Sequence, residues 1–93
     1  MQLQFTEHFD EEYIALHTRD IAAVDAMLDS LEDEHEKPHM RNVIKIGSMA
    51  LFATPRFEAP SGTYRITWKY DNAQQPTIIV CITVAKAEVR RPV

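Results

Sequence analysis

The 93-residue chain has one cysteine, two glycines and no long apolar run. Cys81 has no partner for an internal disulfide, so we expect a small buried hydrophobic side chain and a reducing, cytoplasmic location. No stretch reaches the roughly 18 consecutive apolar residues that suggest a membrane-spanning helix. The start, MQLQFTEHFDEEY, lacks the basic end and apolar centre of a secretory signal. These absences predict a single cytoplasmic domain over residues 1–93 that does not contact a membrane.

The four histidines do not show the spacing of a metal site. His35 and His39 are four residues apart, but Pro38 between them opposes the helix that would place both on one face. No carboxylate–histidine spacing typical of zinc ligands is present. We therefore expect no metal and no small-molecule cofactor.

Charge is distributed unevenly along the chain. Residues 1–39 carry two basic and eleven acidic side chains, a balance of −9, whereas residues 40–93 carry eight basic and three acidic ones, a balance of +5. The total of −4 therefore hides a basic second half. Such a chain can present a cationic face to a phosphate ligand, although acidic side chains that merely solvate helices explain the first half equally well.

Hydrophobic periodicity predicts a short strand and two helices in the first half. Residues 2–5 alternate as in a strand, and Thr6 is placed to cap a helix. That helix loosens near residues 17–18, and a second begins at Asp20 and continues to about Asp33. We favour a tight helical hairpin over one bent helix. The apolar positions at helical spacing are Phe9, Tyr13, Leu16 and, as a further candidate, Ile14 in the first helix, and Ile21, Val24, Leu28 and Leu31 in the second.

The second half predicts three strands after a loop at residues 34–42. The first covers residues 43–54, with a bulge or bend at Gly47, and the second, residues 63–71, follows a turn region at 55–62. The third, residues 77–86, is almost entirely apolar, which indicates a central strand buried on both faces. The order β-α-α-β-β-β predicts an α+β domain in which two N-terminal helices pack on a small antiparallel meander.

The 63–71 strand divides its side chains cleanly between two faces. Tyr64, Ile66 and Trp68 are expected to meet the helices, while Arg65 and Lys69 point to the other side. We expect these two cations to stand close enough to share one phosphate, with Lys86 and Arg56 completing a basic cup. A crowded lysine, Lys69 or Lys86, is the candidate general base, and Glu88 is a weaker one. A solvated outer strand face is the alternative reading of the same pattern.

Two segments resemble the RelE/ParE toxin superfamily of bacterial toxin–antitoxin systems. They are SGTYRITWKYDN at 61–72 and TIIVCITVAK at 77–86, and LFATPRFEAPSG at 51–62 is similar to the strand that delivers an arginine, here Arg56, before the turn. The resemblance implies the RelE-like fold just described. It also implies that Arg65 contacts the scissile phosphate and that Lys86 closes the last strand. RNA-cutting members carry a second arginine after that strand and often a C-terminal tyrosine or histidine, whereas Ala87 and EVRRPV follow Lys86 here.

The function implied by the resemblance is that of a toxin. We expect a metal-independent endoribonuclease that cuts mRNA on the ribosome, inhibits translation and is silenced by a cognate antitoxin. Arg65, Lys69 and Lys86 are the expected catalytic residues, and Arg56, Lys45, Arg90 and Arg91 are the expected RNA-binding residues. The alternative is a non-catalytic protein of the same fold, either a ParE-like inhibitor of DNA gyrase or a degenerate antitoxin-binding protein. An unrelated α+β module is the third reading.

Overall fold

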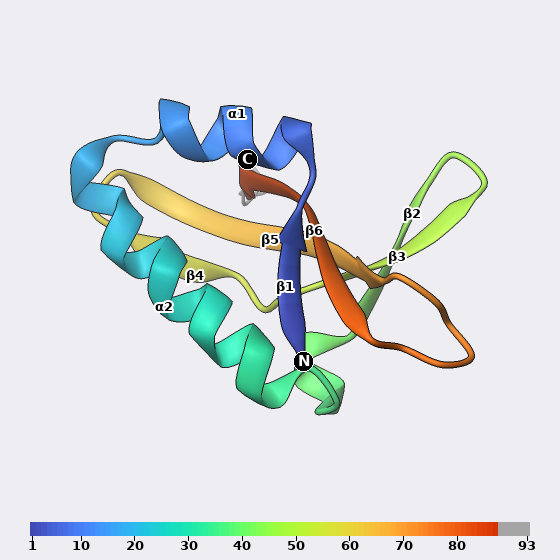
Figure 1. The fold of residues 1–93 in the computed structure, drawn as a ribbon. Helices are drawn as coiled ribbons and strands as arrows, with labels where there is room; N and C mark the ends of the chain where they lie inside the picture. The colour runs from blue at the N-terminus through green and yellow to red at the C-terminus, as the bar shows by residue number, and fades with distance from the viewer. Residues whose placement is uncertain (88–93) are drawn as a thin grey trace.

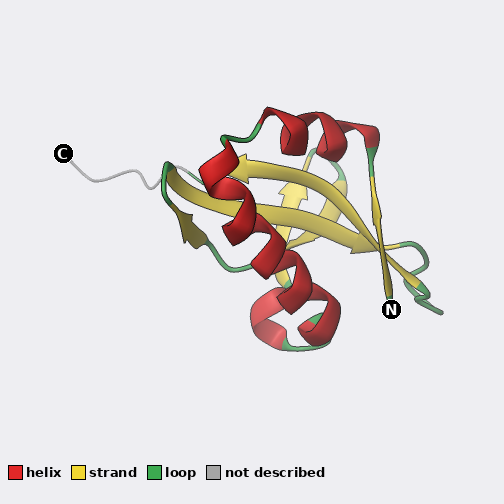
Figure 2. Ribbon diagram, turned by 60° about the vertical axis from the view of Figure 1, so that its left-hand side comes forward, coloured by secondary structure: helices red, strands yellow, loops and turns green. Residues whose placement is uncertain are grey.

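The computed structural model describes residues 1–87 as two helices packed against one face of a twisted sheet (Figures 1 and 2). No helix in this part of the chain is long and apolar enough to cross a bilayer. The elements are β1 (Gln2–Phe5), α1 (Glu7–Ala15), α2 (Thr18–Glu34), a 3-10 turn (Pro38–Met40), β2 (Asn42–Ile46), β3 (Met49–Ala53), β4 (Phe57–Ala59), β5 (Gly62–Tyr70) and β6 (Ile78–Lys86).

The α+β class and the placement of both helices on one face are confirmed, but the sheet is mixed and not purely antiparallel. Its strand order is β1-β6-β5-β3-β2, with β4 pairing to β5 beside this path. The meander from β2 to β6 is antiparallel, whereas β1 lies parallel to β6, with Gln2 opposite Ile78. The sequence alone did not reveal this pairing, because the first strand is short and its partner is the last strand of the chain.

The expected single strand at 43–54 is wrong, because the chain reverses at Gly47. Gly47 adopts a φ of +62°, a conformation that glycine reaches without steric cost, and Ile46 pairs with Met49 across the turn. The resulting β2–β3 hairpin projects from one side of the molecule (Figure 1). A further strand, β4, forms inside the expected turn region, where Ala59 pairs with Gly62.

Two separate helices are confirmed, and local chemistry explains the break between them. Thr6 caps α1 by accepting a hydrogen bond from the Phe9 amide at 3.1 Å. Leu16 and His17 are extended, and the His17 Nδ1 accepts the Arg19 amide, so α2 starts two residues before Asp20. From this break α1 and α2 run in different directions and diverge (Figure 1). Ile14 is 82% exposed, so the expectation that it lies on the buried face of the first helix is wrong.

The core contains the residues that the alternation on β5 predicts. Tyr64, Ile66 and Trp68 are buried in one cluster with side chains of both helices. The Trp68 indole donates to the Met40 carbonyl at 3.0 Å, which satisfies its only polar group. Cys81 is buried as expected, and burial raises the pKa of its thiol to about 12. β6 is central as predicted, but its second face is only half-buried because the helices cover one side.

One extra residue interrupts the pairing of β5 with β6. Thr67 lies opposite Thr83, but Trp68 lies opposite Cys81, so Ile82 forms a β-bulge. Two side chains from the N-terminal part of the chain, Thr6 and Glu12, form hydrogen bonds with β6 at the bulge. The Thr6 hydroxyl donates to the Ile82 carbonyl at 2.8 Å, and Glu12 Oε1 accepts the Val84 amide at 3.1 Å and the Thr83 hydroxyl at 2.5 Å.

A buried carboxylate joins the start of α2 to the turn before β5. Asp20 has no exposed surface and accepts hydrogen bonds from the Ser61 amide at 3.0 Å, the Ser61 hydroxyl and the Tyr64 hydroxyl at 2.9 Å. The Ser61 hydroxyl is the main cause that holds the pKa of Asp20 below its ordinary value of 3.8. The carboxylate also lies in the first turn of α2, where the helix dipole favours negative charge.

We predict that Asp20→Asn lowers the free energy of unfolding at neutral pH, because an amide cannot accept all three hydrogen bonds. The native pKa of Asp20 lies below 3.8, so its contribution is complete above that pH and is lost as the pH falls through the native pKa. In urea unfolding measured at several pH values, the difference in the free energy of unfolding between wild type and Asp20→Asn should therefore become smaller at acidic pH. Asp29→Asn, an exposed change on the same helix, is the control and should leave stability nearly unchanged. A difference in unfolding free energy that becomes larger as the pH falls would contradict the conclusion that ionised Asp20 stabilises the fold.

A second prediction concerns Glu12 at the bulge. Glu12→Ala leaves the Val84 amide without its acceptor and should cost about 1–3 kcal/mol in urea unfolding. Glu12→Gln keeps an oxygen acceptor and should cost less. The exposed Glu11→Ala serves as the control on the same helix. Equal stabilities of the Glu11→Ala and Glu12→Ala variants would show that the bulge does not depend on α1.

Candidate nucleic-acid interface

Four cations from separate parts of the chain line one cavity of about 310 Å³ on the sheet side of the molecule. They are Lys45 of β2, Arg56 from the segment after β3, Arg65 of β5 and Lys86 at the end of β6. The remaining lining residues are Ile44, Ile46, Thr67, Thr83, Ala85 and Ala87. Within residues 1–87 none of the four cations forms an ion pair, so their charges are available to an anion.

The strand register explains why Arg65 has room beside it. Ala85 lies directly opposite Arg65, and Thr83 lies opposite Thr67 on the same face. These neighbours are small, and they leave the half-buried Arg65 guanidinium beside an open space. Ala87, whose amide donates to the Thr63 carbonyl at 2.8 Å, lines the same cavity. An arginine at that position, as in the resemblance, would project into this cavity.

The structure does not bring Lys69 to this cavity. Four positions of extended strand separate it from Arg65, about 13 Å at roughly 3.3 Å per residue. Lys69 is exposed on β5 and does not line the cavity. The expectation that these two side chains share one phosphate is therefore wrong, because alternation gives the same face but not proximity.

Lys86 occupies a different position from the one that simple alternation predicts. It pairs with Tyr64 and not with a residue on the Arg65 face, and its ammonium lies 6.0 Å from the centre of the Tyr64 ring. Its side chain passes over Gly62, where an added Cβ would stand 3.6 Å from the lysine Cε. The expected contacts of Arg90 and Arg91, and the candidate base Glu88, lie outside the described residues.

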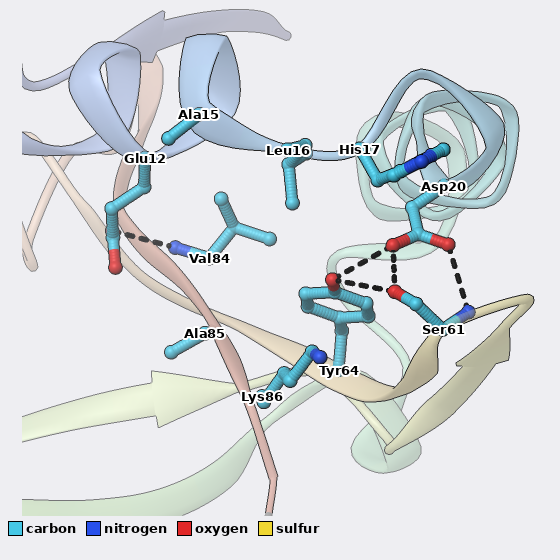
Figure 3. A pocket seen from close by; sticks show the side chains of 10 residues that line it. All are labelled: Glu12, Ala15, Leu16, His17, Asp20, Ser61, Tyr64, Val84, Ala85 and Lys86. Atoms are coloured by element: carbon cyan, nitrogen blue, oxygen red, sulfur yellow. Dashed lines mark hydrogen bonds between the residues drawn. The ribbon is translucent and has the colours of Figure 1, made fainter.

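A second cavity, of about 540 Å³, lies between the helices and the end of β6 (Figure 3). Sequence reasoning missed it entirely. Its lining comes from the break between α1 and α2, from the turn before β5 and from β6: Glu12, Ala15, Leu16, His17, Asp20, Ser61, Tyr64, Val84, Ala85 and Lys86. The only sequence signal was an aspartate at a helix start and a Ser-Gly turn, and both occur in many proteins without a site between them.

Most polar groups of the second cavity already have partners. Asp20 is satisfied by Ser61 and Tyr64, and Glu12 Oε1 accepts from β6 (Figure 3). The His17 Nδ1 accepts the Arg19 amide at 3.3 Å, which makes Nε2 the nitrogen that carries the hydrogen in the neutral ring. The His17 ring is turned toward the start of α2 and away from Tyr64 and Lys86 (Figure 3). Residues 1–87 contain no group of three or more side chains placed to hold a metal ion.

Sequence comparison gives no relative: no protein-family model and no curated protein matches the chain. Comparison with solved structures finds chains of similar fold. The intact E. coli RelBE toxin–antitoxin complex contains a chain similar to this one with a TM-score of 0.64 and 18% identity, covering 95% of this chain and 98% of that chain. The isolated E. coli RelE toxin matches with a TM-score of 0.59 and 19% identity, covering 96% of this chain and 86% of that chain. The chain therefore has the fold of the RelE toxin over nearly its whole length.

Proposed function

We propose that this protein is the toxin of a toxin–antitoxin pair and that it cuts mRNA on the ribosome without a metal. One observation carries the proposal: a chain with the RelE fold gathers Lys45, Arg56, Arg65 and Lys86 around a single cavity. These residues come from three strands and one loop. Such a cluster is costly in self-repulsion unless it binds an anion, and phosphate is the anion that cationic clusters in nucleic-acid enzymes bind.

The cavity fits the charge requirements of RNA cleavage. In this reaction the ribose 2′ oxygen attacks the adjacent phosphorus, the bond from phosphorus to the 5′ oxygen breaks, and a cyclic phosphate and a free 5′ hydroxyl result. Negative charge develops on the phosphoryl oxygens, which Arg65 can contact with two parallel N–H donors. Lys45, Arg56 and Lys86 add point charges or further donors around the same space. Lys86, which lines the cavity from the end of β6 with its ammonium 6.0 Å from the centre of the Tyr64 ring, is the candidate for moving a proton.

An antitoxin partner is part of the proposal. The RelBE structure pairs a toxin of this fold with an antitoxin. In this chain the β2–β3 hairpin exposes Val43 (64%), Ile46 (55%) and Met49 (52%), and within residues 1–87 β2 is an edge strand of the sheet. Exposed apolar edges of this kind attract a partner strand or segment and are seldom left uncovered in the cell. An extended antitoxin segment that bears acidic and apolar residues would suit both the hairpin and the adjacent cations.

Arg65→Ala should abolish growth arrest and reduce mRNA cleavage roughly 10²–10³-fold, the loss that follows removal of one charge-stabilising donor. The measurement is primer extension on an mRNA translated by purified ribosomes with and without the protein. Lys37→Ala removes a cation far along the chain from the cavity and is the control that should cut like wild type. Lys69→Ala should also retain most activity, because Lys69 lies outside the cavity.

Two results would overturn the proposal. Wild-type cleavage by Arg65→Ala would show that the basic cavity is not the active site. Growth arrest by the wild-type protein with intact mRNA would point instead to the gyrase-directed alternative, which DNA supercoiling assays would detect.

A further inference from the structure

Another cavity, of about 270 Å³, lies where α1, α2 and the end of β1 come together. It shares no lining residue with the two cavities described above. Its lining consists of three aromatic side chains, two carboxylates and one aliphatic side chain: Phe5, Phe9, Tyr13, Asp10, Asp25 and Leu28. We call this cavity the aromatic groove.

The three rings of the aromatic groove follow one another along the start of α1. The ring centres of Phe5 and Phe9 are 5.0 Å apart, and those of Phe9 and Tyr13 are 6.3 Å apart. Phe9 and Leu28 are buried and form the floor, whereas Phe5 is 38% exposed. Exposed aromatic rings beside carboxylates form a surface that attracts organic cations, through the negative ring face and the nearby charge.

The two carboxylates of the groove are available to such a cation. Asp10 and Asp25 are exposed, and neither forms an ion pair within the part of the chain that the structure describes. Asp25 Oδ1 accepts the Tyr13 hydroxyl at 2.7 Å, which leaves Oδ2 for another donor. The surrounding segment, residues 1–39, has a balance of −9, so its field also favours a positive ligand.

The Tyr13–Asp25 hydrogen bond separates the two carboxylates. Asp10 and Tyr13 lie three residues apart on α1, which is about 4.5 Å along the helix axis. Asp25 approaches from α2 and meets only the tip of the Tyr13 side chain. The same hydrogen bond raises the pKa of Tyr13 above 10.0, so the phenol stays neutral and the groove carries two negative charges. A ligand that uses both carboxylates needs two positive groups joined by an apolar stem.

We propose that the aromatic groove binds a linear aliphatic polyamine, with one ammonium group on Asp10, another on Asp25 and the methylene stem against the rings. A volume of about 270 Å³ suits a slim ligand, because it lies at the lower end of the range for small-molecule sites. A single guanidinium, such as the arginine side chain of a partner, binds one carboxylate with its two parallel donors and leaves the other unused. This inference is independent of the proposed function, because RNA has no part in it.

Nuclear magnetic resonance titration of the ¹⁵N-labelled protein with spermidine tests the site directly. Spermidine should produce saturable shifts of the Asp10, Tyr13 and Asp25 amides and leave those of Lys45 and Arg65 in place. Nα-acetyl-arginine amide, the probe for a partner's side chain, should bind about two- to fivefold more weakly, because it contacts one carboxylate instead of two.

Two results of these titrations would overturn the inference. Tighter binding of the arginine probe would assign the groove to a cationic side chain of a partner protein. Shifts that spread over both helices without saturating would show only diffuse attraction of a polycation to the acidic half of the chain.

Matched variants separate the groove from that diffuse attraction. Asp10→Asn should weaken spermidine binding about two- to fivefold, whereas Asp29→Asn removes the same charge from an exposed position outside the groove and should have a much smaller effect. Phe5→Leu keeps the net charge and an apolar side chain but removes the exposed ring, and should also weaken binding about two- to fivefold. Equal effects of Asp10→Asn and Asp29→Asn, or unchanged binding by Phe5→Leu, would contradict the proposed site.

Discussion

The extra residue at Ile82 determines which side of the sheet Lys86 faces. Between Tyr70 and Trp68, β5 pairs with β6 in one register, and beyond the bulge it pairs one residue further along. Without the bulge, Lys86 would lie opposite Thr63, on the face that carries Arg65. With it, Val84 joins Ile79 and Cys81 in the core, and Lys86 lies opposite Tyr64. Thr6 and Glu12 form hydrogen bonds with the backbone at the bulge. The cap and the side chain of α1 therefore help to set the position of Lys86 at the end of β6.

The same geometry explains how a basic cavity arises in a chain with a net charge of −4. The acidic residues are concentrated in the helical half, and the sheet side collects cations from β2, β5, β6 and the segment after β3. Ala87 occupies the place where the resemblance would put a second arginine, and it lines the cavity without contributing charge. Lys45 and Arg56 supply cations there instead.

Periodicity predicted the parts of the fold that repeat regularly. Tyr64, Ile66 and Trp68 are buried because β5 alternates without interruption, and Val24, Leu28 and Leu31 meet them because α2 keeps a helical period. Periodicity could not predict where the regular repeat is interrupted. The β6 bulge is invisible in a run where nearly every residue is apolar, and the turn at Gly47 lies inside a continuous apolar stretch. Asp20 resembled the surrounding solvated acids, because nothing local distinguishes a buried carboxylate whose partners are forty residues away.

The position of Lys86 is therefore the feature on which the interpretation of both cavities depends. Side-chain nuclear Overhauser effects in solution measure it most directly. The structure predicts strong contacts between the Lys86 methylene protons and the Tyr64 ring, together with a backbone pattern that pairs Lys86 with Tyr64 and leaves Ile82 unpaired. Contacts from Lys86 to the Arg65 side of the sheet, with Lys86 paired to Thr63, would show that the bulge is absent.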